Sequence, residues 1–160
     1  MKKTMMLLLT IVLAMVISAC AGDKSSTIEV KQSAKEMADQ MVEKVEQPAQ
    51  MELSAEEFRN LYNIDPDKLE DYSVRVPMMN VKTNEIAILK VKDAKDVAEV
   101  EAAAKQRAEN VMKQFEQYLP DQYENAKNYK LITKGNYVLL VISDSADELI
   151  KVYDSFFEQK

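Results

Sequence analysis

Two short segments of the chain are apolar at almost every position, and they constrain the fold more than any other feature. Residues 86–91 are interrupted only by Lys90, and residues 137–142 contain no charged side chain. Successive side chains of a strand point to opposite faces, so a strand that is apolar on both faces must be covered on both. We therefore expect these segments to be the central strands of a sheet packed against helices.

Each apolar segment is preceded by a second strand pattern and followed by a helical one. Residues 72–78 alternate between apolar and polar side chains, and residues 129–133 lead into a tight hairpin signal at Gly135. Apolar residues at helical spacing then predict helices over residues 93–118, before Pro120, and over residues 145–157. The order strand–strand–helix thus occurs twice.

Capping patterns predict where several helices begin. A serine followed three residues later by glutamate is a capping box, and it occurs at Ser33–Glu36, Ser54–Glu57 and Ser145–Glu148. We predict an α+β fold: two N-terminal helices, then strand–strand–helix twice, with a four-stranded, mostly antiparallel sheet. The two long helices should cover one face and the N-terminal helices part of the other.

The N-terminus has the three parts of a secretory signal. It has a basic start at Lys2 and Lys3, an apolar run of 13 residues over 5–17, and small residues before Cys20. A membrane-spanning helix needs roughly 20 apolar residues, so this run is too short for a permanent span. Residues 17–20 resemble the bacterial lipobox at all four positions, and this resemblance implies cleavage before Cys20 and a lipid on its sulfur.

The resulting organisation is a signal peptide over residues 1–19, a lipidated Cys20 with a polar tether to residue 32, and a single domain over residues 33–160. Cleavage removes two of the 21 basic residues and none of the 27 acidic ones, which leaves a net charge of −8. The expected location is therefore the outer side of the cell membrane. The alternative is an ordinary secreted protein whose cysteine falls at the cut by chance.

Several activities are excluded by composition. The chain has no histidine and one cysteine, which excludes Ser-His-Asp and Cys-His catalysis, a zinc site of the usual kind and an intramolecular disulfide. Its two glycines cannot build a phosphate-binding loop. A net charge of −6 and a pI near 4.9 argue against nucleic acid as a partner. We expect no catalytic residue, no metal and no cofactor.

One acidic cluster leaves a question open. Asp65, Asp67, Glu70 and Asp71 lie within seven residues. Such a density of carboxylates could hold Ca²⁺. Pro66 interrupts the loop, however, and an aspartate that caps a helical turn explains the first two acids without a metal.

The candidate binding residues are Arg75, Met78 and Met79. Pro77 cannot donate a ladder hydrogen bond, so it predicts that its strand lies at a sheet edge within reach of a partner. Alternation places Met78 with the core residues, and Met79 and Arg75 on the opposite face. Paired methionines form adaptable binding surfaces, although Met79 could instead pack under an N-terminal helix. Arg75 or Arg107 could hold an anion.

A set of short motifs resembles one family of small Gram-positive lipoproteins. The motifs are Asn63-Ile64-Asp65, Pro77-Met78-Met79-Asn80-Val81, Glu85-Ile86-Ala87, Lys90-Val91-Lys92-Asp93, Gln117-Tyr118-Leu119-Pro120 and Gly135-Asn136-Tyr137-Val138. The resemblance covers residues 33–158, and it implies an extracytoplasmic domain whose function is unknown. It carries over no active-site residue.

These observations favour a non-catalytic, membrane-tethered interaction module of the cell envelope. Its expected partners are the membrane, through the lipid on Cys20, and another envelope protein. A small-ligand binder and a carboxylate-dependent enzyme remain as alternatives.

Overall fold

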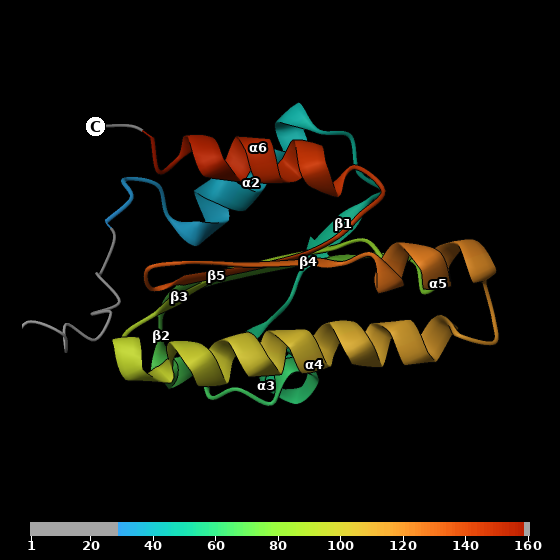
Figure 1. Cartoon of the computed structure of the whole chain (residues 1–160), viewed down its shortest axis with the longest axis horizontal. Coiled ribbons are helices and arrows are strands. Elements are labelled where there is room, and N and C mark those ends of the chain that lie inside the picture. The colour runs from blue at the N-terminus through green and yellow to red at the C-terminus, as the bar shows by residue number, and fades with distance from the viewer. Residues whose placement is uncertain (1–28, 159–160) are drawn as a thin grey trace, which may run out of the picture.

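The computed structural model describes residues 29–158, which form one five-stranded antiparallel sheet with helices on both faces (Figure 1). The strands are β1 (Gln50–Glu52), β2 (Leu69–Pro77), β3 (Glu85–Val91), β4 (Lys130–Lys134) and β5 (Tyr137–Ile142), in the spatial order β1-β2-β3-β5-β4. The predicted signal peptide, Cys20 and most of the tether lie outside the described residues.

The two apolar segments are adjacent central strands, as predicted. Every residue of β3 and β5 is buried, and the two strands pair antiparallel with Ala87 opposite Leu140 and Ile88 opposite Leu139. Ala87 and Leu140 belong to the core on one side of the sheet, and Ile88 and Leu139 to the core on the other. The apolar segments of both strands have apolar side chains on both faces because each strand contributes to both cores.

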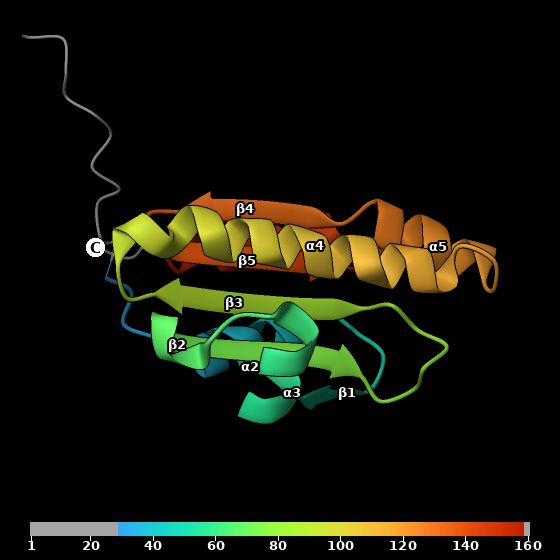
Figure 2. The same cartoon turned by 90° about the horizontal axis from the view of Figure 1, so that it is seen from below.

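The helices divide between the two faces differently from the prediction. Helices α3 (Ala55–Tyr62), α4 (Val97–Phe115) and α5 (Pro120–Lys127) pack on one face, whereas α2 (Ala34–Lys44) and α6 (Ala146–Ser155) pack on the other (Figures 1 and 2). The expectation that the long C-terminal helices share a face is wrong. The 19-residue α4 and its neighbours already cover one face, so the apolar side chains on the other, such as Ile86 and Leu139, need both α2 and α6.

The sheet has five strands, not four, because β1 was not predicted. Its three residues are too few to show an alternating pattern. β1 pairs with β2, with Gln50 opposite Pro77, so β2 is not the edge strand that Pro77 suggested. The proline is tolerated because it is the last residue of its strand, and the next N–H, that of Met78, donates to the Ala49 oxygen at 2.9 Å.

Helix α5 was also missed, because Pro120 begins a helix instead of only ending one. Proline is favoured in the first turn of a helix, where its missing N–H would have no partner. Pro120 occupies that position in α5, while α4 already ends at Phe115. Tyr118, expected on the buried stripe, is 61% exposed between the two helices.

Two of the three predicted capping boxes are formed. The Ser33 hydroxyl accepts from the Glu36 N–H while the Glu36 carboxylate accepts from the Ser33 N–H, and Ser54 and Glu57 repeat this arrangement. The Ser145 side chain makes no capping bond, because this residue does not adopt the extended backbone that Ser33 and Ser54 share.

The capping glutamates titrate below their usual range. Hydrogen bonds from the Ser33 backbone and side chain lower the pKa of Glu36, and those from the Ser54 side chain and backbone lower the pKa of Glu57. Each carboxylate therefore stabilises the fold fully above the pKa of an unfolded glutamate. This contribution is lost as the pH falls through the lowered pKa of the folded state.

We expect Ser33→Ala and Ser54→Ala each to reduce the free energy of unfolding by about 1 kcal/mol, because each removes an N-cap acceptor. Ser145→Ala is the matched control and should change it little, since its hydroxyl caps nothing. Urea unfolding at neutral pH measures all three. Equal losses from the three variants would show that the capping boxes do not contribute.

Candidate functional site

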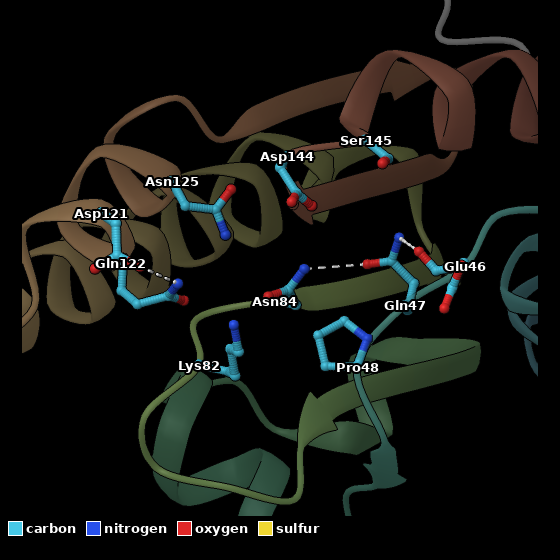
Figure 3. A pocket seen from close by; sticks show the side chains of 10 residues that line it. All are labelled: Glu46, Gln47, Pro48, Lys82, Asn84, Asp121, Gln122, Asn125, Asp144 and Ser145. Atoms are coloured by element: carbon cyan, nitrogen blue, oxygen red, sulfur yellow. Dashed lines mark hydrogen bonds between the residues drawn. The ribbon is translucent and has the colours of Figure 1, made fainter.

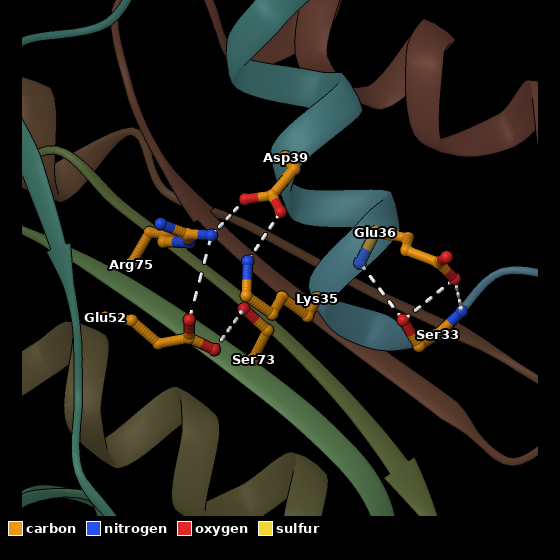
Figure 4. A network of polar contacts seen from close by, with 7 residues as sticks. All are labelled: Ser33, Lys35, Glu36, Asp39, Glu52, Ser73 and Arg75. Carbon is orange, nitrogen blue, oxygen red and sulfur yellow. Dashed lines mark hydrogen bonds and ion pairs between the residues drawn. The ribbon is translucent and has the colours of Figure 1, made fainter.

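Arg75, the first predicted binding residue, is engaged inside the fold (Figure 4). Its guanidinium pairs with Asp39 of α2 and lies 3.7 Å from a Glu52 carboxylate oxygen on β1, and its side chain is 16% exposed. A hydrogen bond from Lys35, with Arg75 contributing, lowers the pKa of Asp39 despite the opposing effect of burial. The expectation that Arg75 lies on a face away from the core is wrong, because α2 and a second core cover that face.

Met78 and Met79 are the most exposed large apolar side chains of the described residues, at 65% and 63%. Alternation wrongly placed Met78 in the core, because the strand ends at Pro77 and the chain turns away from the sheet. Met79 does not pack under an N-terminal helix.

Two further exposed apolar residues belong to neighbouring elements: Leu61 shares a hollow with Met79, and Met51 lies on the adjacent strand β1. Leu61 of α3 lines a hollow of about 180 Å³ together with Met79, and Met51 of β1 pairs with Val76, which lines the same hollow. Met51 and Leu61 are 43% and 39% exposed. We call Met51, Leu61, Met78 and Met79 the methionine surface.

A buried charged cluster borders the hollow beneath the methionine surface. Glu85, at the start of β3, is 1% exposed and accepts hydrogen bonds from the Arg107 guanidinium at 2.7 to 3.2 Å. The Tyr62 hydroxyl donates to the Glu85 Oε1 at 2.6 Å. Burial, and then the Glu85 charge, raise the pKa of Tyr62 well above its usual value.

Arg107, which the sequence analysis named as a possible anion-binding residue, is instead paired with Glu85 in this cluster. Burial acts to lower the pKa of Arg107, but the charge and hydrogen bonds of Glu85 outweigh it and raise this pKa. The guanidinium is therefore charged and already neutralised inside the protein. Two sequence features could have indicated this buried ion pair. Glu85 is a single acid at the start of an apolar strand, and Arg107 lies between Ala104 and Ala108 on the buried face of its helix.

A second site, not predicted from the sequence, is a polar cleft of about 690 Å³ at the end of the sheet where β3 begins (Figure 3). Four segments that are distant in sequence form its walls. Its lining residues are Glu46, Gln47, Pro48, Lys82, Asn84, Asp121, Gln122, Asn125, Asp144 and Ser145.

Hydrogen bonds between the segments hold the walls of the cleft in place. The Asn84 amide nitrogen donates to Gln47 Oε1 at 3.2 Å, and the Ser143 hydroxyl donates to the same oxygen at 3.0 Å. On the opposite side, the Thr83 N–H donates to Gln122 Oε1 at 3.1 Å, and Asn125 donates to the Thr83 hydroxyl at 3.0 Å. The cleft is thus built from side chains already fixed by neighbouring segments.

The charges in the cleft are largely unpaired. Among residues 29–158, no ion pair is formed by Lys82, Glu46 or Asp144, although Asp144 accepts a hydrogen bond from Ser143 at 3.4 Å. A hydrogen bond from Gln122 is the main cause that lowers the pKa of Asp121, and the positive charge of Lys82 contributes.

The acids at residues 65–71 do not form a joint site, because three of them contact different parts of the protein. Asp65 caps the 3₁₀ turn η1 (Pro66–Lys68), Glu70 pairs with Lys90 at 2.8 Å, and Asp71 accepts from the Ala34 N–H at 2.6 Å. Within the described part of the chain, no group of three or more acidic, histidine or cysteine side chains is arranged to hold a metal ion. In the same residues, no helix is long and apolar enough to cross a bilayer.

Comparison with known proteins gives one match. A family model described as a domain of unknown function (DUF4358) matches residues 43–143, a range that includes all five strands. No curated protein and no solved structure matches the chain.

Proposed function

Because the chain belongs to the DUF4358 family, whose function is itself unknown, we propose its function from its own residues. The protein is a membrane-tethered binding module of the cell envelope, with no chemistry of its own. It faces outward and docks through the methionine surface onto another envelope component. The exposure of Met78 and Met79 is the observation that carries this proposal.

The tether rests on the sequence. Residues 17–20 fit the lipobox, and the sole cysteine lies at the cut. Lipobox lipoproteins carry at least two acyl chains, and two chains anchor stably where one is marginal. A tether confines the domain near its neighbours and raises their effective concentration, so a small adaptable surface is sufficient for binding.

The methionine surface has the chemistry of such a docking site. Methionine side chains are flexible and polarisable, so they adapt to a partner's shape. They lie beside the charged cluster of Glu85 and Arg107, whose charges cancel at the border of the hollow. A partner there meets apolar side chains and a neutralised pair, and Lys82, which also lines the hollow, is the charge that it must leave in water or match with an acceptor.

The partner should present an apolar group within a neutral or basic surface. The chain from Cys20 onward carries a net charge of −8, and like charges facing each other across an interface reduce affinity. The alternative of a carboxylate-dependent enzyme is less favoured, because the most buried carboxylate, Glu85, is fully engaged with Arg107 and Tyr62.

The test is crosslinking in living cells with a photoreactive residue at position 79, and the same residue at Tyr118 as the control. Tyr118 is about equally exposed but lies outside the methionine surface. We expect a discrete protein adduct from position 79 and none from position 118. Leu61→Asp should then reduce the adduct about tenfold, because burying an aliphatic side chain contributes 1.5 to 3 kcal/mol and tenfold corresponds to about 1.4 kcal/mol.

If positions 79 and 118 give the same adducts, the methionine surface is not the docking site. Turnover of a substrate by the purified protein, abolished by one Asp or Glu replacement that leaves it folded, would overturn the non-catalytic function.

A further inference from the structure

We propose that the polar cleft binds a small molecule that carries both a primary ammonium group and a carboxylate: a free amino acid or a short peptide with free ends. This inference is independent of the methionine surface and of any macromolecular partner. It rests on the volume of the cleft, on a buried amide that faces it, and on the arrangement of its charges.

The volume suits a small organic molecule. Ligand pockets commonly enclose about 300 to 1,000 Å³, and this cleft encloses about 690 Å³. Nine of its ten lining residues have polar or charged side chains, whereas most small-molecule sites are lined by hydrophobic and aromatic ones. The lining therefore selects a ligand that is itself polar along its length.

Within residues 29–158, one amide oxygen that faces the cleft accepts no hydrogen bond from the protein. Asn84 is only 4% exposed and lines the cleft. Its amide nitrogen donates to Gln47, but no residue of the described part donates to its side-chain oxygen. This oxygen is not one of the buried side-chain atoms that lack a partner, so it can be reached from the cleft and can accept from an N–H or ammonium of a ligand.

The charges of the cleft favour a ligand with two opposite charges. Lys82 reaches up toward Asn84 from one side, and Asp144 and Glu46 lie on other sides of the cleft (Figure 3). A simple anion would meet the carboxylates of Glu46, Asp121 and Asp144, and a simple diamine would meet Lys82. A carboxylate placed at Lys82 and an ammonium placed at Asp144 satisfy charges of both signs at once.

The cleft requires little rearrangement to bind. Asn84, Gln47, Gln122 and Asn125 are held by hydrogen bonds to neighbouring segments. A site whose side chains are already ordered loses less conformational entropy when a ligand arrives, which improves affinity.

The experiment is a titration of the full chain, labelled with ¹⁵N in detergent micelles, followed through the side-chain amide signals of Asn84, Gln122 and Asn125. The probes are alanine, trialanine, N-acetyl-trialanine, trialanine amide and the diamine putrescine. We expect saturable shifts of these amides with trialanine or alanine, and about tenfold weaker binding when either end is blocked, since each block removes one charge-assisted contact. Comparing alanine with trialanine separates a free amino acid from a peptide.

Two variants connect the effect to the cleft. Lys82→Met and Asp144→Asn should each weaken trialanine binding about tenfold. Lys105→Met and Asp67→Asn are the matched controls, because both side chains are exposed and lie outside the cleft, and they should leave binding unchanged.

Three results would overturn the proposal. They are the absence of any saturable shift with alanine or trialanine, equal binding of the end-blocked peptides, and putrescine binding that exceeds trialanine binding and is unaffected by Lys82→Met. None of them bears on crosslinking at position 79, so the two proposals fail separately.

Discussion

Arg107→Leu should destabilise the fold by about 3 to 5 kcal/mol, because it leaves the Glu85 carboxylate buried without a cation. Glu85 is 1% exposed, and its hydrogen bonds come from Arg107 and Tyr62. Once Arg107 is removed, only the Tyr62 hydroxyl still donates to the carboxylate. Urea unfolding followed by circular dichroism measures the loss.

The matched control is Arg59→Leu. Arg59 lies 3.6 Å from Asp65 with both side chains more than half exposed, and exposed ion pairs contribute at most about 1 kcal/mol. The double variant Glu85→Leu with Arg107→Leu should recover much of the lost stability, because replacing both members of a buried pair removes the uncompensated charge. If the double variant is no more stable than Arg107→Leu, the penalty arises from lost packing and not from the stranded carboxylate.

Cys20→Ser should move the protein from the membrane fraction to the soluble fraction in a bacterial host and abolish its uptake of labelled fatty acid. Serine has no thiol to which the lipid can be attached. In the proposed function, the acyl chains of that lipid are the protein's whole attachment to the membrane. Fractionation and fatty-acid labelling of the wild type and the variant provide the measurement.

The control keeps a cysteine but moves it. The double variant Cys20→Ser with Ser26→Cys also has one cysteine, but this cysteine does not directly follow Ile17, Ser18 and Ala19. It should remain unlipidated and soluble. A wild type that takes up no lipid, with a Cys20→Ser variant that stays membrane-bound, would discard the lipobox interpretation.

The sequence predicted the parts of the fold that depend on long, regular patterns. The apolar runs of β3 and β5 and the two capping boxes of α2 and α3 occur where expected. The missed elements are those with weak local signals. β1 has three residues, and α5 begins at a proline that reads equally well as the end of the preceding helix.

The sites were less predictable because they depend on which segments meet. Met79 remains a predicted binding residue, whereas Met78 was wrongly placed in the core and Arg75 wrongly placed on a face away from the core. Met78 lies outside the core because β2 ends at Pro77, and Arg75 contacts α2 because helices cover both faces of the sheet. The polar cleft combines residues from 46 to 145, and no local pattern brings them together.

The start of the described chain and the two binding regions lie at opposite ends of the sheet. Glu29 pairs with Lys90, near the end of β3, at 3.2 Å, whereas Asn84 of the cleft and the loop that carries Met79 precede the first residue of β3 (Figure 1). The seven residues of β3 separate these ends by roughly 24 Å at about 3.4 Å per residue.

If Cys20 carries the lipid as proposed, the position of the binding regions at the far end of the sheet determines how far above the bilayer they lie. The nine residue steps from Cys20 to Glu29 span at most about 30 Å, and the sheet adds its own length beyond them. The binding end then points away from the lipid headgroups and reaches a layer roughly 25 to 55 Å above them. Under the proposed function, we therefore expect targets that stand clear of the membrane plane, and not the lipid surface itself.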